Sequence, residues 1–457
     1  METRNVAGFS APRSGAGEIE PQRVMKPLLR LLAVVAMVGV PVLLYRMGKG
    51  LGVTALGTVV PWGLWVAFYI FFIGLSAGSF LLSTTVYVFR SERLAGVGRA
   101  SVGRRFEDQI VGERLAGVGR LALVQALACL ATGLAFISVD LGHWERFWHV
   151  LVYPQWRSVL PWEVYLYTAY AGILLLALYF LMRCDLSRRG SEAQGSAQGF
   201  YRLLSLGFRC PDDPEAKRAC DVENLRRVRL ISIIGIPIAL AAATDMVFAV
   251  VKARPAWFSP GFAMGSTVSA LASAAALMLF VRAMVLPGPE KDRALLQTLA
   301  RLTGILLIVN LFILGIELLT GFYGGVPDHL AVLRLTLFGP FWWVFWVLQL
   351  AVGAALPLLL IYGRAEGATP GRLGLAGLLV TIGLFGERLN DVIPAQAVPV
   401  FPGLDTAVSS ARLTALYVPN GVEWLSSWGI VALAALLTYF VMRRLPMVEH
   451  RSYPGEE

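Results

Sequence analysis

Ten apolar segments, each long enough to cross a lipid bilayer as a helix, restrict the fold of this 457-residue chain more than any other feature. A helical span needs about 20 mainly apolar residues. Lipid cannot satisfy free backbone N–H and C=O groups, and a barrel would instead show short segments of alternating polarity. The pattern therefore predicts an all-α polytopic membrane protein. The predicted spans are 27–45, 61–89, 119–139, 161–182, 229–251, 261–285, 302–322, 338–362, 372–390 and 421–442.

The composition agrees with this class of protein. Hydrophobic residues make up 56% of the chain and charged residues only 15%. A soluble protein carries about 25% charged residues, so a soluble globular fold is excluded.

The distribution of Lys and Arg predicts the orientation of the spans. Of the 40 Lys and Arg residues, 30 fall in the two termini and the loops on their side, and 9 fall in the opposite loops. Basic residues concentrate on the cytoplasmic side, so we expect a multi-pass protein of the cell (inner) membrane with both termini cytoplasmic. The net charge of +10 then reflects topology and contact with anionic membrane lipid. Nothing suggests a nucleic-acid partner.

The predicted spans divide the chain into five parts. They are a disordered cytoplasmic tail (1–26), a first helical bundle (27–182), a cytoplasmic loop that is either a small helical cap or mobile (183–228), a second helical bundle (229–390), and a last part with an outer loop, the final span and a cytoplasmic tail (391–457). Glycines four residues apart, Gly74 with Gly78 and Gly261 with Gly265, predict close helix packing by the second and sixth spans.

The sequence offers no recognisable metal or haem site. Its four cysteines form no CxxC pair, which is the usual element of iron–sulfur and zinc sites. Haem in a helical bundle needs axial ligands, usually histidines, near the middle of the spans. The four histidines instead fall in predicted loops or a tail, at His143, His149, His329 and His450. We therefore expect neither haem nor metal in this chain.

Residues 139–170 form the stretch richest in reactive side chains, because two histidines, several acids and arginines and nine aromatic rings occur together there. An amphipathic helix over 140–152, lying in the outer interface, is predicted by the helical spacing of an apolar stripe. On that helix Asp140 faces the bundle and His143 lies at an edge. Arg146 and His149 face water, lipid headgroups or a partner protein. The apolar stripe comprises Trp144, Phe147, Trp148, Leu151 and Val152.

The acids inside the predicted spans gather on the outer side. Charged groups in a membrane are costly and often mark functional sites. Structural roles remain open for some of them: Glu163 stands in a first helical turn, where a carboxylate favours the helix dipole, Glu317 could pair with an arginine of a neighbouring span, and Glu387 could pair with Arg388. The outer-side acids are Glu163, Asp245, Glu317, Glu387 and Glu423.

Several segments resemble the NrfD/PsrC family, the membrane subunits of polysulfide reductase-type enzymes. The ten spans are similar to members of the alternative complex III and hydrogenase-2 type. The most specific block is DLGHWERFWHVL at 140–151, followed by LPWEVYLY at 160–167. Weaker similarities extend from the second to the tenth span: FFIGLSAGSFLLS (71–83), GSTVSALASAAAL (265–277), ELLTGFY (317–323), GERLNDVIP (386–394) and YVPNGVEW (417–424).

The resemblance implies two four-helix bundles with one extra helix at each end and no haem. It also implies a quinone or quinol, menaquinone or ubiquinone, in an outer-side pocket of the first bundle. The implied partners are a ferredoxin-like iron–sulfur subunit on the outer face and a molybdopterin-type catalytic subunit. Asp140, His143 and Glu163 match positions of the family pattern. The family often has a His followed by Ser or Thr in the fifth span, where this chain has AAATDMVF, so Asp245 could substitute as proton acceptor or the site could be altered.

These features lead to a hypothesis in which the chain exchanges electrons between quinol and the iron–sulfur subunit and releases protons on the outer side. His143 and Glu163 would flank the quinol headgroup as general bases, and Asp140 would orient or relay. Trp162 and Tyr165 would pack the ring, Asp245 would complete the binding site, and Arg146 and His149 would dock the partner. Two alternatives stay open: a secondary transporter with an outward-facing acidic site, and a structural anchor that has lost its quinone site.

Overall fold

The computed structural model describes residues 25–94, 104–285, 293–363, 369–401, 403 and 413–447, and these are helical and contain no strand. The predicted tail 1–26 therefore lies outside the described residues, except for Met25 and Lys26, which open the first helix. The long helices are α1 (Met25–Lys49), α2 (Leu64–Leu94), α3 (Arg104–Asp140), α5 (Val159–Glu192), α7 (Pro214–Ala243), α9 (Pro260–Phe280), α10 (Arg293–Gly324), α13 (Pro370–Ala397) and α14 (Gly421–Arg444), together with a π-helical segment η5 (Val344–Ala355) that continues as α12 (Leu356–Tyr362).

Nine of these helices, within the described residues, are long and apolar enough to cross a membrane. The remaining predicted span corresponds to α7. The chain is thus an all-α polytopic membrane protein with about ten spans, as the sequence predicts.

The predicted fifth span, 229–251, is not one continuous helix. The helix α7 ends at Ala243, and Asp245 adopts a left-handed conformation with φ of 49° before the single turn α8 (Met246–Ala249). Asp is among the few residues that tolerate this region, so the break costs little locally. It turns the Asp245 side chain out of the helical register that the sequence predicts.

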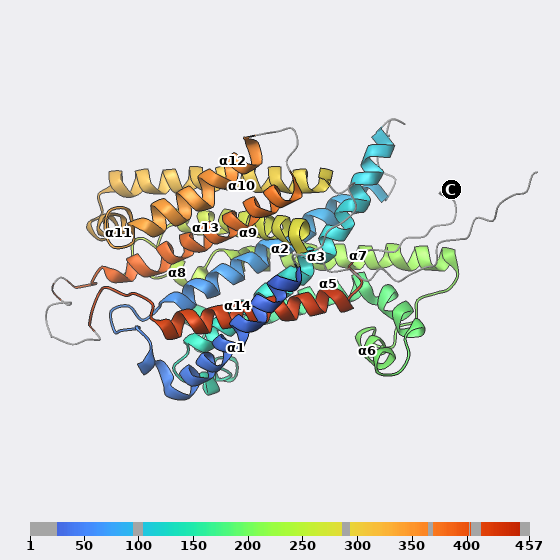
Figure 1. Ribbon diagram of the computed structural model, residues 1–457, viewed down its shortest axis with the longest axis horizontal. Coiled ribbons are helices and arrows are strands. Elements are labelled where there is room, and N and C mark those ends of the chain that lie inside the picture. Colours follow the sequence, from blue (N-terminus) through green and yellow to red (C-terminus); the bar gives the residue numbers. More distant parts are fainter. Residues whose placement is uncertain are drawn as a thin grey trace, which may run out of the picture.

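The long helices form two groups and a flanking pair (Figure 1). Helices α2, α3, α5 and α7 pack together as the first bundle, and α9, α10, α13 and the η5–α12 segment form the second. The flanking helices α1 and α14, from opposite ends of the chain, pack against each other, and α14 also contacts α3. The two extra helices therefore lie side by side on the first bundle.

Small residues permit the closest helix contacts. A methyl group added at Gly78 of α2 would overlap the carbonyl oxygen of Ala270 in α9, so the predicted glycine pair of the second span joins the two bundles. Gly39 of α1 and Gly429 of α14 touch backbone to backbone in the same way. Close approach of this kind is the usual basis of helix association in lipid, where burial of apolar surface gives no advantage.

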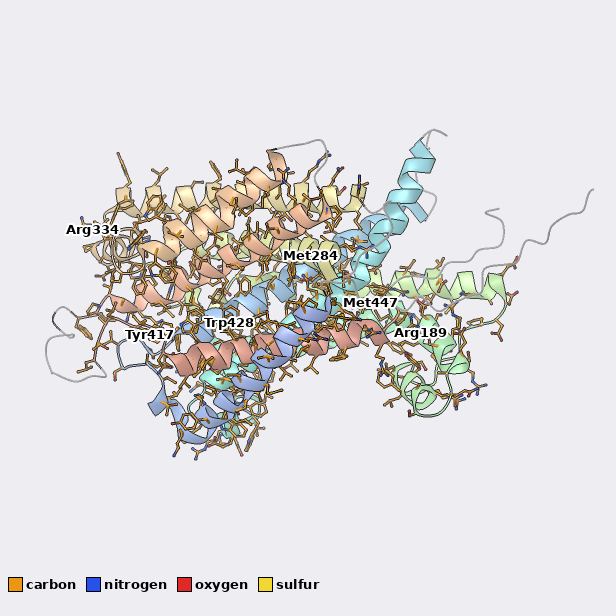
Figure 2. The ribbon with its side chains drawn as sticks, in the orientation of Figure 1. Arg189, Met284, Arg334, Tyr417, Trp428 and Met447 are labelled. Carbon is orange, nitrogen blue, oxygen red and sulfur yellow. The ribbon has the colours of Figure 1, made fainter. Side chains whose placement is uncertain are left out.

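The loops that the sequence assigns to the outside gather at one end of the molecule, which we call the outer end. Figure 2 shows Arg334 and Tyr417 at this end and Arg189 and Met447 at the opposite, inner end. The segment between α5 and α7 at the inner end is not a simple loop, because α6 (Ser196–Leu204) and the first turns of α7 make much of 183–228 helical.

The segment 140–152 is not one continuous amphipathic helix, so this prediction is wrong. Asp140 is the last residue of α3, and the segment continues as the 3-10 turn η2 (Trp144–Arg146) and the single helical turn α4 (His149–Val152). Its apolar side chains are exposed, among them Phe147 and Trp148. The apolar residues recur at helical spacing in the sequence, but the backbone forms two short turns and not one helix.

The contact between Gly78 and Ala270 can be tested with Gly78→Ala. We expect a loss of about 1–3 kcal/mol of stability, because the added methyl group overpacks a backbone contact. Gly315→Ala in α10 is the matched control, because a methyl group there meets no atom within 4 Å. The temperature of thermal unfolding in detergent should fall clearly for Gly78→Ala and should stay unchanged or rise for Gly315→Ala. Equal unfolding temperatures would contradict the close packing of the two bundles.

Candidate functional site

Glu163 is a predicted site residue that is buried and belongs to a chain of hydrogen bonds. It lies in the second turn of α5, which Ser158 caps by accepting a hydrogen bond from the backbone N–H of Leu160, and it is only 4% exposed. The hydroxyl of Tyr167, one turn further on, donates to its Oε1 at 2.8 Å. A second hydroxyl, that of Tyr69 in α2, lies 2.8 Å from that of Tyr167. Glu163, Tyr167 and Tyr69 thus form a buried chain of hydrogen bonds from α5 to α2.

The two tyrosines of this chain were not predicted as site residues. The spacing of four between Glu163 and Tyr167 places them on one helix face, so this part could have been found from the sequence. Tyr69 belongs to another span, α2, and the packing of α2 and α5 on the same two helices, α3 and α7, brings it to Tyr167.

Trp162 and Tyr165 do not pack a ring beside Glu163, in contrast to the prediction. The indole of Trp162 donates to the carbonyl oxygen of Trp156 at 3.0 Å, and the hydroxyl of Tyr165 donates to that of Leu151 at 2.7 Å. The Tyr165 ring stacks on Trp156 with 5.7 Å between centroids. Both side chains therefore hold the outer segment 148–158 against the start of α5.

His143 is also separated from the buried acids. Its Nδ1 lies 3.0 Å from Oε1 of Glu145, and the two side chains are 72% and 51% exposed. Hydrogen bonds from the backbone and from His143 lower the pKa of Glu145. Arg146 and His149 are exposed as well. The prediction that His143 and Glu163 flank one headgroup is therefore not supported, because no described contact joins them and one is exposed to water.

Asp140 is half-buried at the end of α3. Its Oδ1 is buried without a hydrogen-bond partner among the described residues, and it interacts electrostatically with Arg46 of α1. Asp140 and Glu163 stand on different helices, and no described hydrogen bond connects them.

Asp245 forms a buried ion pair with Arg388 of α13. Nη1 of Arg388 lies 3.0 Å from Oδ2 of Asp245, and each side chain is 3% exposed. The same nitrogen donates to the hydroxyl of Ser266 at 2.8 Å and to Asp391 at 3.1 Å, while Nη2 donates to the carbonyl oxygen of Ser266 at 3.0 Å. Oxygens from three elements thus surround one guanidinium, which meets the condition for a stable charge in a membrane interior.

Glu387, the neighbour of Arg388, does not pair with it. Its Oε2 accepts hydrogen bonds from Nδ2 of Asn310 at 2.7 Å and from Nε2 of Gln349 at 3.4 Å. Gln349 in turn accepts from Asn390 at 2.9 Å. The alternative that Glu387 pairs with Arg388 is therefore wrong; two carboxamides bind the carboxylate instead, and a third, that of Asn390, binds Gln349.

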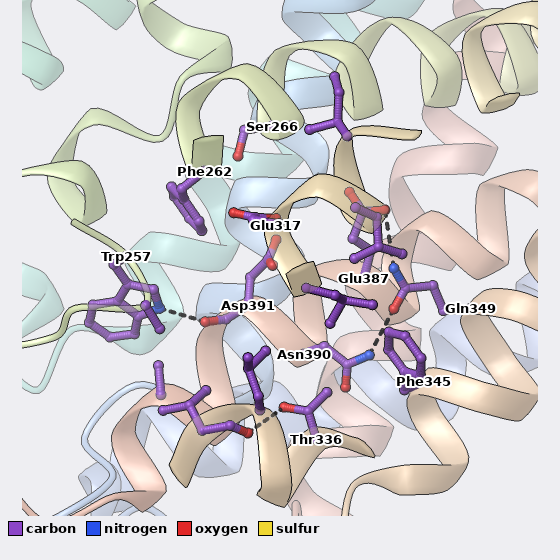
Figure 3. A pocket seen from close by; sticks show the side chains of 18 of the residues that line it. Trp257, Phe262, Ser266, Glu317, Thr336, Phe345, Gln349, Glu387, Asn390 and Asp391 are labelled. Atoms are coloured by element: carbon purple, nitrogen blue, oxygen red, sulfur yellow. Dashed lines mark hydrogen bonds between the residues drawn. The ribbon is translucent and has the colours of Figure 1, made fainter. Parts of the chain in front are cut away.

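These groups border a small cavity in the second bundle (Figure 3). Its volume is about 100 Å³, far below the roughly 300–1,000 Å³ of typical ligand pockets. Glu317 and Asp391 lie on one side of it, while Gln349, Asn390 and Glu387 lie on another. His329, in the outer helix α11 (Pro327–Leu337), also lines the cavity, and burial lowers its pKa. The cavity is large enough for a few water molecules.

The acids of the two bundles are close enough to interact electrostatically. Asp245 acts on both Glu163 and Tyr69 of the first bundle, and on the other side it is joined to Arg388. We call this set the outer polar layer. It comprises Tyr69, Glu163, Tyr167, Asp245, Glu317, Glu387, Arg388 and Asp391. Within the described residues, no group of three or more His, Cys, Asp or Glu side chains is placed to hold a metal ion.

The Asp245–Arg388 pair predicts a specific mutational pattern. Arg388→Gln alone should destabilise the protein by about 3–5 kcal/mol, because it leaves Asp245 as an uncompensated buried charge. Asp245→Asn alone should cost less, because Asp391 still lies 3.1 Å from Arg388. The double variant should recover part of that loss. Arg188→Gln, which breaks an exposed pair with Glu192, is the control and should cost less than about 1 kcal/mol. Thermal unfolding in detergent measures all four. Additive losses in the double variant would contradict a direct pair.

Comparison with known proteins places this architecture in a family. A family profile described as "Polysulphide reductase, NrfD" matches residues 52–400. A selenate reductase subunit of Mesobacillus selenatarsenatis is 36% identical over 91% of this chain and 93% of its own length. A protein of Halobacterium salinarum, named as a membrane subunit of dimethyl sulfoxide reductase, is 26% identical over 92% of this chain and 91% of its own. The Hdr-like menaquinol oxidoreductase integral membrane subunit of Archaeoglobus fulgidus is 22% identical over 89% and 90%, respectively.

The profile covers most of the chain, and all three relatives match nearly their full length. The resemblance drawn from the 140–151 and 160–167 segments is thereby confirmed. This chain belongs to the polysulphide reductase NrfD family of membrane proteins.

Proposed function

We propose that this chain is the quinone-reactive membrane subunit of an oxidoreductase complex. It exchanges electrons between quinol or quinone in the membrane and an iron–sulfur partner subunit, and protons leave or enter at the outer end. The names of the relatives support this proposal, because they are subunits of reductases and one is called a menaquinol oxidoreductase subunit. The terminal substrate chemistry belongs to a partner, for which a molybdopterin-type subunit is the proposed class.

The observation that carries the proposal is the buried hydrogen-bond chain from Glu163 through Tyr167 to Tyr69. Oxidation of a quinol releases two protons and two electrons, so the site needs a proton acceptor that is shielded from bulk water. A carboxylate with a fixed hydroxyl partner can take a proton by general base catalysis. Glu163 lies near the outer end, so an accepted proton has a short way to the outer side.

Asp245 and Asp140 are the other proposed proton-handling groups. Asp245 interacts electrostatically with Glu163, and its pairing with Arg388 fixes its position. A proton gained by Glu163 changes the charge that Asp245 experiences, which couples the two bundles. Asp140 lies at the end of α3 next to the outer segment and is the second candidate acceptor.

The outer segment 141–158 is the proposed docking surface for the iron–sulfur subunit. Arg146 and His149 are exposed on it, as is His143, and exposed aromatic rings surround them. Tyr and Trp rings together with Arg are enriched in protein interfaces. The exposed rings of this segment are Trp144, Phe147, Trp148, Tyr153 and Trp156.

The decisive experiment is quinol oxidation by membranes that carry the whole complex with Glu163→Gln. We expect the rate to fall by about 100-fold or more, because general base catalysis contributes roughly that factor, while the assembled complex remains. Glu192→Gln is the matched control, since Glu192 lies on the same helix at its far end and is 67% exposed, and it should keep the wild-type rate. A wild-type rate for an assembled Glu163→Gln complex would refute Glu163 as the proton acceptor.

A further inference from the structure

Arg46 is a buried arginine whose guanidinium is largely unpaired. It lies on α1, the flanking helix, near the outer end, and it is 0% exposed. Its Nη2 donates to the carbonyl oxygen of Leu141 at 3.0 Å, and the group lies over the Trp65 ring at 5.1 Å. Its Nε and Nη1 are buried and have no hydrogen-bond partner among the described residues. A buried cation of this kind is costly unless its donors are satisfied.

Asp140, which lies near Arg46, also has a side-chain oxygen without a hydrogen-bond partner among the described residues. It precedes Leu141 and interacts electrostatically with Arg46, yet the two side chains form no ion pair within 4.0 Å in the described part of the chain. Its Oδ1 is buried without a hydrogen-bond partner. The Arg46 guanidinium and the Asp140 carboxylate therefore lie near each other and are not in direct contact. Each keeps hydrogen-bonding atoms without a partner among the described residues.

Two of the three other buried arginines contact a carboxylate directly. Arg120 contacts Asp185 at 2.7 Å, and Arg388 contacts Asp245 at 3.0 Å. Direct contact is the expected arrangement, because a buried pair repays its desolvation only with good hydrogen-bond geometry. The third, Arg183, lies over the Phe180 and Phe208 rings instead, and its Nε is buried without a hydrogen-bond partner among the described residues. Arg46 and Asp140 likewise lack the direct contact of the first two pairs.

The third charged group nearby is already satisfied. Glu423 at the start of α14 accepts hydrogen bonds from the hydroxyl of Tyr417 and from the backbone N–H groups of Asn420 and Ala55. It forms a capping box with Asn420 and is 0% exposed. Arg46 and Asp140 are therefore the groups at this place that retain free donors and a free acceptor.

We propose that Arg46 and Asp140 together bind one ring oxygen of the quinone, so that the flanking helix α1 supplies part of the substrate site. This proposal rests on the proposed function. An oxygen between the two groups accepts a hydrogen bond from Arg46, and as a quinol hydroxyl it also donates to Asp140. On oxidation the O–H bond breaks and its proton moves to the Asp140 carboxylate. The two electrons of the quinol pass to the iron–sulfur partner, and the O–H bond of the other hydroxyl breaks with transfer of the second proton to water at the outer end.

The alternative ligand between the two groups is water, because a water molecule also accepts a hydrogen bond from Arg46 and donates one to Asp140. Arg46 could then serve only as a cap on the last carbonyl groups of α3, which a cation favours. Binding of a quinone analogue separates these cases, since a water-filled helix cap does not require that Arg46 affect the affinity for a ring.

The experiment measures binding of a hydroxyquinoline N-oxide, a quinol analogue, to the intact complex in detergent. Arg46→Gln should raise its Kd by about tenfold or more, which is the effect of losing about 1.4 kcal/mol of interaction. Arg46→Lys, which keeps the charge but not the fork of donors, should show an intermediate loss. Asp140→Asn should lower the rate of quinol oxidation more than it raises Kd. Arg30→Gln, an exposed position on the same helix, is the control.

The outcomes distinguish this proposal from the proposed function. If Arg46→Gln and Arg46→Lys both bind the analogue like wild type while Glu163→Gln still abolishes oxidation, the pair holds water only and the inference is wrong. If the wild-type complex neither binds the analogue nor oxidises quinol, the proposed function fails first. Should Arg46→Gln not assemble, Arg46→Lys and Asp140→Asn decide the question, because the first keeps the charge of the side chain and the second keeps its shape.

Discussion

The Arg388 guanidinium is the group on which the outer half of the second bundle depends. In lipid a lone arginine would cost several kcal/mol, so the fold must bring oxygens to it. Those oxygens come from Asp245 after α7, Ser266 in α9 and Asp391 on α13 itself. The requirement explains the break at Asp245, since a helix continuing past Ala243 would not present its side chain in the same direction. One buried charge thereby fixes three elements and the position of a functional candidate.

The packing of α7 carries this constraint into the first bundle. Asp245 follows α7, which packs on both α2 and α5, and it therefore lies within electrostatic range of Glu163 and Tyr69. In a low-dielectric interior such interactions are stronger than in water. A change of charge at Glu163 is therefore felt at the Asp245–Arg388 pair. The two bundles are therefore connected both by helix packing and by electrostatics.

Hydropathy and basic residues predicted the class of fold, about ten spans and the gathering of Glu163, Asp245, Glu317 and Glu387 toward one end. These features depend on whether each segment lies in lipid or in water, and the residue types of the segment alone decide this. The errors arose where tertiary partners decide. The predicted helix over 140–152 is divided into two short turns, and the partner of Arg388 is 143 positions away in sequence at Asp245. Trp162 and Tyr165 turn to the Trp156 segment, which no periodicity reveals. Arg46 was counted only as a topology signal.

That last omission has a physical cause that applies to flanking helices in general. A basic residue close to the outer end of a span can extend its side chain into water, so sequence alone predicts an exposed Arg46. Here α14 packs on α1 through Gly39 and Gly429, and α2 places Trp65 beneath the guanidinium. The group is enclosed before it can reach the surface. Its burial therefore follows from the pairing of the two chain ends, which makes the flanking pair part of the chemical environment of Asp140 and not only a support for the bundle.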